Sequence, residues 1–169
     1  MRKWITGTFV LLLWHSLYAQ EPREGAIPAL DATAGNQAVQ IKSRIEYVTI
    51  NRLSNNPESG MLLSQDVVYR PLGSPVDVSV RYALFDTDSY DSRIYTYENN
   101  ALYVYSIPAY YYRGSRAYVM VRWTLFNRCD LWIRYGTFIY DGRKTLGTGP
   151  EAINGNQKSD LTVQLRMGF

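Results

Sequence analysis

The sequence has a single cysteine, Cys129, and a single histidine, His15. A disulfide within the chain is therefore excluded, and no cysteine follows the first apolar run to carry a lipid anchor. We expect His15 to be removed with the export signal, which leaves no histidine base for acyl transfer. Cys129 lies at an expected turn without a histidine partner, which favours a passive thiol over a nucleophile. These absences predict a protein that is not an enzyme and has no cofactor and no metal site.

The chain also lacks a strong excess of either charge, with 18 basic and 15 acidic residues. Two of the basic residues, Arg2 and Lys3, belong to the expected export signal, so the remainder is nearly neutral. Beyond that signal the sequence contains no cluster of basic residues. We therefore expect no nucleic-acid partner.

No apolar run is long enough for a membrane-spanning helix, which needs about twenty residues. The run from Trp4 to Trp14 follows a short basic start, is interrupted at His15, and is followed by the small residue Ala19. This order is typical of a signal peptide over residues 1–19, with cleavage near Ala19. The alternative, an uncleaved anchor, fits the length less well.

Residues 20–37 contain prolines and glycines without an apolar period and predict a flexible periplasmic lead-in. From residue 38 to 169 apolar and polar residues alternate with a period of two, which predicts an all-β domain. Eight antiparallel strands are expected, at residues 39–52, 61–70, 75–85, 92–98, 101–109, 115–126, 129–140 and 159–169.

The last of these segments alternates most regularly and ends the sequence on an aromatic residue. Its apolar positions are Leu161, Val163, Leu165, Met167 and Phe169. The segment resembles the terminal strand of bacterial outer-membrane proteins, which implies an assembly signal, a barrel-insertion machinery as partner, and lipid around the protein. A sheet in lipid must close to pair its edges, so we expect an up-and-down transmembrane β-barrel of about eight strands. A water-soluble β-sandwich would alternate as well and remains the alternative fold.

The polar faces of the expected strands would point into the barrel, which is too narrow at eight strands for an open pore. We expect charged side chains to fill it as an ionic cluster that includes Glu46, Asp77, Arg81, Arg122, Arg134 and Arg166. A turn at 127–129 would place Arg122 directly opposite Arg134, so acids such as Asp77, Glu46 or Asp160 are needed nearby. Tyrosines near strand ends are expected at the membrane interface; they are Tyr69, Tyr82, Tyr110, Tyr111, Tyr112 and Tyr140.

Several segments together resemble a known family of outer-membrane proteins. They are Asp86-Thr87-Asp88-Ser89-Tyr90-Asp91-Ser92-Arg93-Ile94-Tyr95, Ser106-Ile107-Pro108-Ala109, Arg113-Gly114-Ser115-Arg116, Trp132-Ile133-Arg134-Tyr135 and Ile153-Asn154-Gly155-Asn156. From about residue 40 the chain resembles the C-terminal barrel portion of proteins that carry helix-hairpin-helix repeats ahead of the barrel. No such repeat fits between Gln20 and Gln37, so a DNA-related role is not implied. This departure from the family leaves an alternative to the barrel of about eight strands, in which the chain is the C-terminal part of a larger barrel.

The sequence leaves three functions open. The first is a non-catalytic outer-membrane barrel that acts through surface loops or as a structural component, with an unknown loop ligand. The second is a remnant or subunit of a larger transport or DNA-handling barrel. The third is a secreted periplasmic β-sandwich binding module.

Overall fold

The computed structural model describes residues 27–35, 38–50, 56–126, 128–147 and 152–168. Over these residues the chain is all-β, with antiparallel pairing throughout. The expected cleavage site near Ala19 and the terminal Phe169 lie outside the described residues. No helix in the described part of the chain is long and apolar enough to span a membrane.

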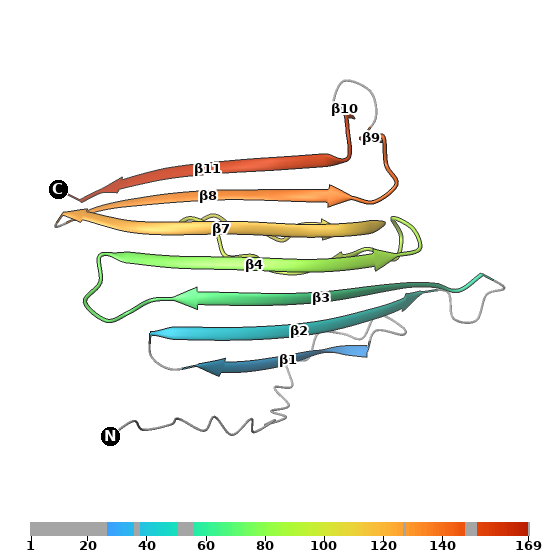
Figure 1. Ribbon diagram of the computed structural model, residues 1–169, viewed down its shortest axis with the longest axis horizontal. Coiled ribbons are helices and arrows are strands. Elements are labelled where there is room, and N and C mark those ends of the chain that lie inside the picture. Colours follow the sequence, from blue (N-terminus) through green and yellow to red (C-terminus); the bar gives the residue numbers. More distant parts are fainter. Residues whose placement is uncertain (1–26, 36–37, 51–55, 127, 148–151, 169) are drawn as a thin grey trace, which may run out of the picture.

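Seven long strands form one sheet in the order β1-β2-β3-β4-β7-β8-β11, seen side by side in Figure 1. The strands are β1 (Ile27–Gly35), β2 (Val39–Ile50), β3 (Glu58–Tyr69), β4 (Val76–Thr87), β7 (Arg113–Phe126), β8 (Cys129–Tyr140) and β11 (Gln157–Met167). Each pairs with its neighbour in the order, and only the β4–β7 pair is separated by the long segment 88–112. Strands β1 and β11 are the two edges of this sheet.

Four two-residue strands form two small pairs outside the main sheet. One pair joins β9 (Thr145–Leu146) to β10 (Ile153–Asn154) in the connection between β8 and β11. The other joins β5 (Ile94–Tyr95) to β6 (Ala109–Tyr110). The second pair belongs to residues 88–112, which connect β4 to β7 and which we call the insert. In Figure 1 the insert passes behind β4 and β7.

The expected strands at 92–98 and 101–109 are wrong, because only Ile94–Tyr95 and Ala109–Tyr110 are strands there. The side chains of these segments do alternate: Ile94, Thr96 and Glu98 are buried while Tyr95 and Tyr97 are exposed. The alternation arises because the insert packs against a face of the sheet and not beside another strand. Period alone does not distinguish these two arrangements.

The flexible lead-in expected over residues 20–37 contains strand β1, so the sheet begins earlier than residue 38. The β1 sequence has little apolar period, and its place in the sheet follows from its pairing with β2. Asp31 supports that pairing through ion pairs with Lys42 and Arg44. With β1 added and two strands lost, the sheet has seven strands, and among the described residues it is open.

The two faces of the sheet differ in chemistry. The face away from the insert, which we call the apolar face, carries large exposed side chains from every long strand. They include Leu30, Ile41, Ile45, Tyr47, Met61, Leu63, Val67, Tyr69, Val80, Tyr82, Leu84, Val119, Trp123, Leu125, Ile133, Tyr135, Ile139, Leu161, Val163, Leu165 and Met167. The opposite face, which we call the polar face, carries most of the charged residues of the strands and is covered by the insert.

The apolar core lies between the polar face and the insert, near the end of the sheet where the insert begins. It consists of Leu62, Ala83, Phe85, Ile94, Tyr110, Phe138, Tyr140 and Leu146. Phe85 lies at its centre and makes edge-to-face contacts with Tyr110 and Phe138 at centroid distances of 5.4 and 5.9 Å. Contacts of this kind add to the free energy gained by burying the rings.

Replacing Phe85 by alanine should lower the free energy of unfolding by about 3–5 kcal/mol, because it leaves a cavity among the core rings. The matched change Leu84→Ala, one residue earlier and on the apolar face, should cost less than about 1 kcal/mol, because that side chain is half exposed and its loss leaves no cavity. Denaturant unfolding of both variants measures this. A larger loss for Leu84→Ala would mean that the apolar face is the core, as in a sandwich.

Candidate functional site: the ion pairs of the polar face

Glu98, in the insert, lies at the centre of the polar face and is fully buried. Its carboxylate accepts hydrogen bonds from Arg116 on β7, at 3.1 and 3.0 Å, and from Arg134 on β8. Both guanidinium groups also donate to Asp160 on β11, so two cations face two anions. Hydrogen bonds between charged partners of this kind are stronger than neutral ones.

The phenol of Tyr110 donates a 2.6 Å hydrogen bond to the Glu98 carboxylate. Burial raises the pKa of Tyr110 well above its usual value, and the nearby Glu98 carboxylate adds to the shift. The phenol is therefore a fixed proton donor and not a titrating group near neutral pH.

The backbone around Glu98 is bound by the same face of the sheet. Arg81 donates a 2.7 Å hydrogen bond to the carbonyl of Tyr97, and Arg134 donates one of 3.1 Å to the carbonyl of Asn99. Arg44 donates to the Thr96 hydroxyl at 3.2 Å. Together with Arg116, arginines from four strands therefore hold residues 96–99, and their guanidinium geometry suits such multiple contacts.

Gly136 on β8 provides the space that Arg116 occupies. A Cβ atom at this position would lie 2.6 Å from Nη2 of Arg116, and the guanidinium also stacks over Phe138 at 4.3 Å. The absence of a side chain at Gly136 thus allows the guanidinium to lie flat on the sheet beneath Glu98.

All six residues of the expected ionic cluster lie on polar-face positions, but they belong to separate groups. Arg134 joins the group around Glu98. Arg81 forms a buried pair with Asp66, at 2.5 Å. Asp77 lies 3.4 Å from Arg122, which also contacts Asp130 at 3.1 Å, and Arg166 contacts the same Asp130 at 2.7 Å. Glu46 is apart from these residues and lies 3.6 Å from Arg44.

The expectation that Arg122 lies opposite Arg134 is wrong. Arg122 is opposite Trp132, and Arg134 is opposite Met120. The shift is two residues: one arises because Phe126 pairs with Cys129, and the other from an irregularity in the pairing between Thr124 and Phe126. Sequence reasoning also missed Glu98, Asp66 and Asp130, although the excess of arginines on the polar positions indicated that further acids were needed.

The residues of the expected assembly signal, Leu161, Val163, Leu165 and Met167, all lie exposed on the apolar face of the edge strand β11. Of the expected interfacial tyrosines, Tyr69 and Tyr82 are exposed on this face. Tyr110 and Tyr140 are instead buried in the core, so that expectation is wrong for these two. Among the described residues no cluster of three or more potential metal ligands is found.

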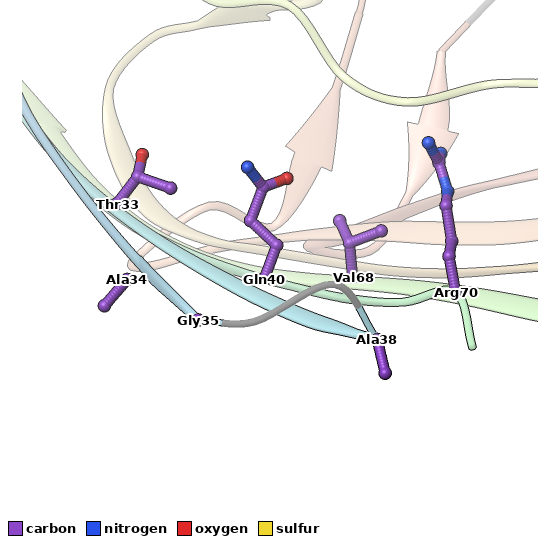
Figure 2. A pocket seen from close by; sticks show the side chains of 7 residues that line it. All are labelled: Thr33, Ala34, Gly35, Ala38, Gln40, Val68 and Arg70. Atoms are coloured by element: carbon purple, nitrogen blue, oxygen red, sulfur yellow. The ribbon is translucent and has the colours of Figure 1, made fainter. Parts of the chain in front are cut away.

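Two hollows lie on the polar face at the end of the sheet where β11 ends. Figure 2 shows the first, into which Thr33, Gln40 and Arg70 project while Ala34 and Ala38 point away. Arg70 also lines the second hollow, with Asp77, Arg122 and other residues of β4, β7, β8 and β11.

The comparisons with known proteins give no relatives: no family model matches the chain, and neither a curated protein nor a solved structure is significantly similar to it.

Glu98→Gln should lower the free energy of unfolding by about 3–5 kcal/mol, because it leaves the buried guanidinium groups of Arg116 and Arg134 with only the half-exposed Asp160 as an anion. The amides of the insert should exchange with solvent faster than in the parent protein. Hydrogen exchange and denaturant unfolding measure the two effects. As a control, Asp91→Asn removes an exposed carboxylate from the same insert and should change stability by less than about 0.5 kcal/mol. Equal effects of the two substitutions would refute the anchoring role of Glu98.

Gly136→Ala should cost about 1–3 kcal/mol, because the new methyl group displaces the Arg116 guanidinium. In an Arg116→Ala background the same change should cost less than about 1 kcal/mol, since the atoms it meets are gone. The four proteins form a double-mutant cycle whose coupling energy is read from denaturant unfolding. A coupling energy near zero would show that Gly136 matters for another reason.

Proposed function

We propose that this chain is a non-catalytic structural protein of the outer membrane, whose sheet is part of a β-barrel wall. One observation supports this proposal above all. The sheet exposes its apolar side chains and buries its ion pairs under the insert, which is the opposite of the arrangement in a water-soluble protein. An exposed apolar face of this extent requires lipid or a partner. Under the insert, the buried charges of Glu98, Arg116 and Arg134 are paired with one another, as the inside of a barrel in lipid requires.

The dimensions of the strands support the membrane location. Strands β2, β3, β4 and β8 have 12 residues each, and β7 has 14. A tilted strand needs about 9–11 residues to cross the hydrocarbon core. If β11 ends on the periplasmic side, the insert and the β8–β11 connection both start outside. These would be the surface loops, and the insert folds inward from there.

The open sheet favours a barrel larger than eight strands. An eight-stranded barrel has room only for its own side chains, whereas the insert adds a layer of backbone to the polar face. On the insert, Tyr103 and Tyr105 are each 86% exposed. Further strands around the insert would cover these rings, which favours the second candidate function, a subunit of a larger barrel.

The direction of the edge strands limits how the barrel closes. Because all seven strands alternate in direction, β1 and β11 run the same way, and joining them directly would give a parallel pair. Closure with antiparallel pairs alone needs an odd number of additional strands. The resemblance to barrels that follow helix-hairpin-helix repeats is compatible with a larger ring, without implying a role in DNA handling.

An arginine in the middle of the apolar face should be costly in lipid. Val80→Arg should destabilise the protein folded in vesicles by about 2–4 kcal/mol, and Val76→Arg, at the start of the same strand, by about 0–1 kcal/mol. Folding into phosphatidylcholine vesicles, followed by denaturant titration, measures this difference. If the chain is soluble in buffer and Val80→Arg has no larger cost than Val76→Arg, the membrane proposal fails and a sandwich module is favoured.

The two sides of strand β11 can be tested separately, because one side pairs with β8 and the other is a free edge of the sheet. The hydrogen bonds from Tyr140 to Asn156 and from Gly168 to Arg128 show that even-numbered residues of β11 bond to β8. The backbone groups of odd-numbered residues therefore point to the free edge. Val163→Pro removes an outward N–H and Gln164→Pro an inward one.

Val163→Pro should leave the sheet folded but abolish assembly with further strands, because a proline is tolerated only where no ladder hydrogen bond is lost. Gln164→Pro should destabilise the sheet itself. Circular dichroism and heat-modifiable migration on gels measure folding and assembly. Normal assembly of Val163→Pro in the outer membrane would show that this edge pairs with nothing.

A further inference from the structure

The charges on the polar face balance almost completely. The group of Asp31, Lys42, Arg44 and Glu46, the pair of Asp66 and Arg81, and the group of Glu98, Arg116, Arg134 and Asp160 each contain equal numbers of cations and anions. The same is true of Asp77, Arg122, Asp130 and Arg166. Beside this last group lies Arg70, which makes no ion pair with any carboxylate in the described part of the chain.

The unpaired charge of Arg70 coincides with a cavity of about 320 Å³. Arg122 and Arg166 line the same cavity, and their side chains are 41% and 51% exposed, so their guanidinium groups are accessible to a ligand. The Nε atom of Arg122 is buried and has no hydrogen-bond partner among the described residues. A buried donor without an acceptor is unfavourable, and it leaves the Arg122 guanidinium without its full set of hydrogen bonds.

The other residues that line the cavity contact Arg122 and Arg166 or add apolar surface. The buried ring of Trp132 lies beneath Arg122 and Arg166, whose guanidinium carbons are 5.6 and 5.9 Å from its centroid. Leu102, at the tip of the insert, and Met120 add apolar surface to the lining. The cavity thus offers guanidinium donors and apolar contacts for a carbon skeleton, together with the Asp77 carboxylate, which is paired with Arg122.

We infer that this cavity binds a small soluble organic anion, whose phosphate or carboxylate oxygens pair with Arg70 and Arg122. The guanidinium groups of arginine recognise such oxyanions by paired hydrogen bonds. The volume is larger than an inorganic phosphate requires and is within the range of small-molecule sites. The cavity opens on the polar face and not on the apolar face, which favours a soluble anion over a lipid headgroup.

Calorimetric titration of the full chain in detergent micelles tests this inference, with glucose 6-phosphate as the probe. Saturable binding is expected, and neutral glucose should not bind. Arg70→Gln should raise the Kd at least about tenfold, as loss of a charge-assisted hydrogen bond does, and Arg122→Lys, which keeps the charge but loses the planar guanidinium donors, should also weaken binding. Arg113→Gln removes an exposed charge at the other end of the sheet and should leave the Kd unchanged.

Each other result would overturn the inference. Equal binding of glucose and glucose 6-phosphate would show that the anion is not recognised, and an equal loss in Arg113→Gln would show nonspecific attraction. Binding of short-chain phosphatidylglycerol through Arg70, without binding of glucose 6-phosphate, would identify a lipid headgroup as the ligand in place of a soluble anion. The titration does not depend on the membrane proposal, because the cavity belongs to the sheet and insert alone.

Discussion

The enclosure of Glu98 by Arg116 and Arg134 is the interaction on which the remaining structure depends. It brings a carboxylate from the insert to the polar face, where two buried guanidinium groups would otherwise have only the half-exposed Asp160. Once Glu98 is bound, residues 96–99 lie against four strands, and the aromatic core forms between insert and sheet. The apolar core of this protein is therefore positioned by ion pairs, the reverse of the usual order in soluble domains.

The period of two in the sequence predicted six of the seven long strands, within a few residues at each end. They are β2, β3, β4, β7, β8 and β11. Their faces were also correct, because alternation fixes which side chains share a face. Strand β1 was missed since its small residues carry no apolar period. Its position depends on pairing with β2 and on the Asp31 ion pairs, which no local pattern reveals.

The candidate site was predicted in part. The four arginines were assigned to one polar face with Glu46 and Asp77, but Asp66, Glu98 and Asp130, which also form ion pairs with these arginines, were not found. The sequence predicted Glu98 at the end of a strand over residues 92–98. Ile94, Thr96 and Glu98 alternate with the same period whether their segment pairs within a sheet or packs against the face of a sheet. The register of Arg122 also depended on an irregularity near Phe126 that the turn residues do not indicate.

The position of the insert between two adjacent strands bears on the order of folding. Strands β4 and β7 pair directly, although residues 88–112 separate them, so their pairing closes a longer loop than the turns from β3 to β4 and from β7 to β8. The entropy of loop closure grows only slowly with length, but contacts that are distant in sequence form more slowly than local ones. The β2–β3–β4 and β7–β8–β11 units can therefore form first as separate meanders. The insert then joins them and covers part of the polar face.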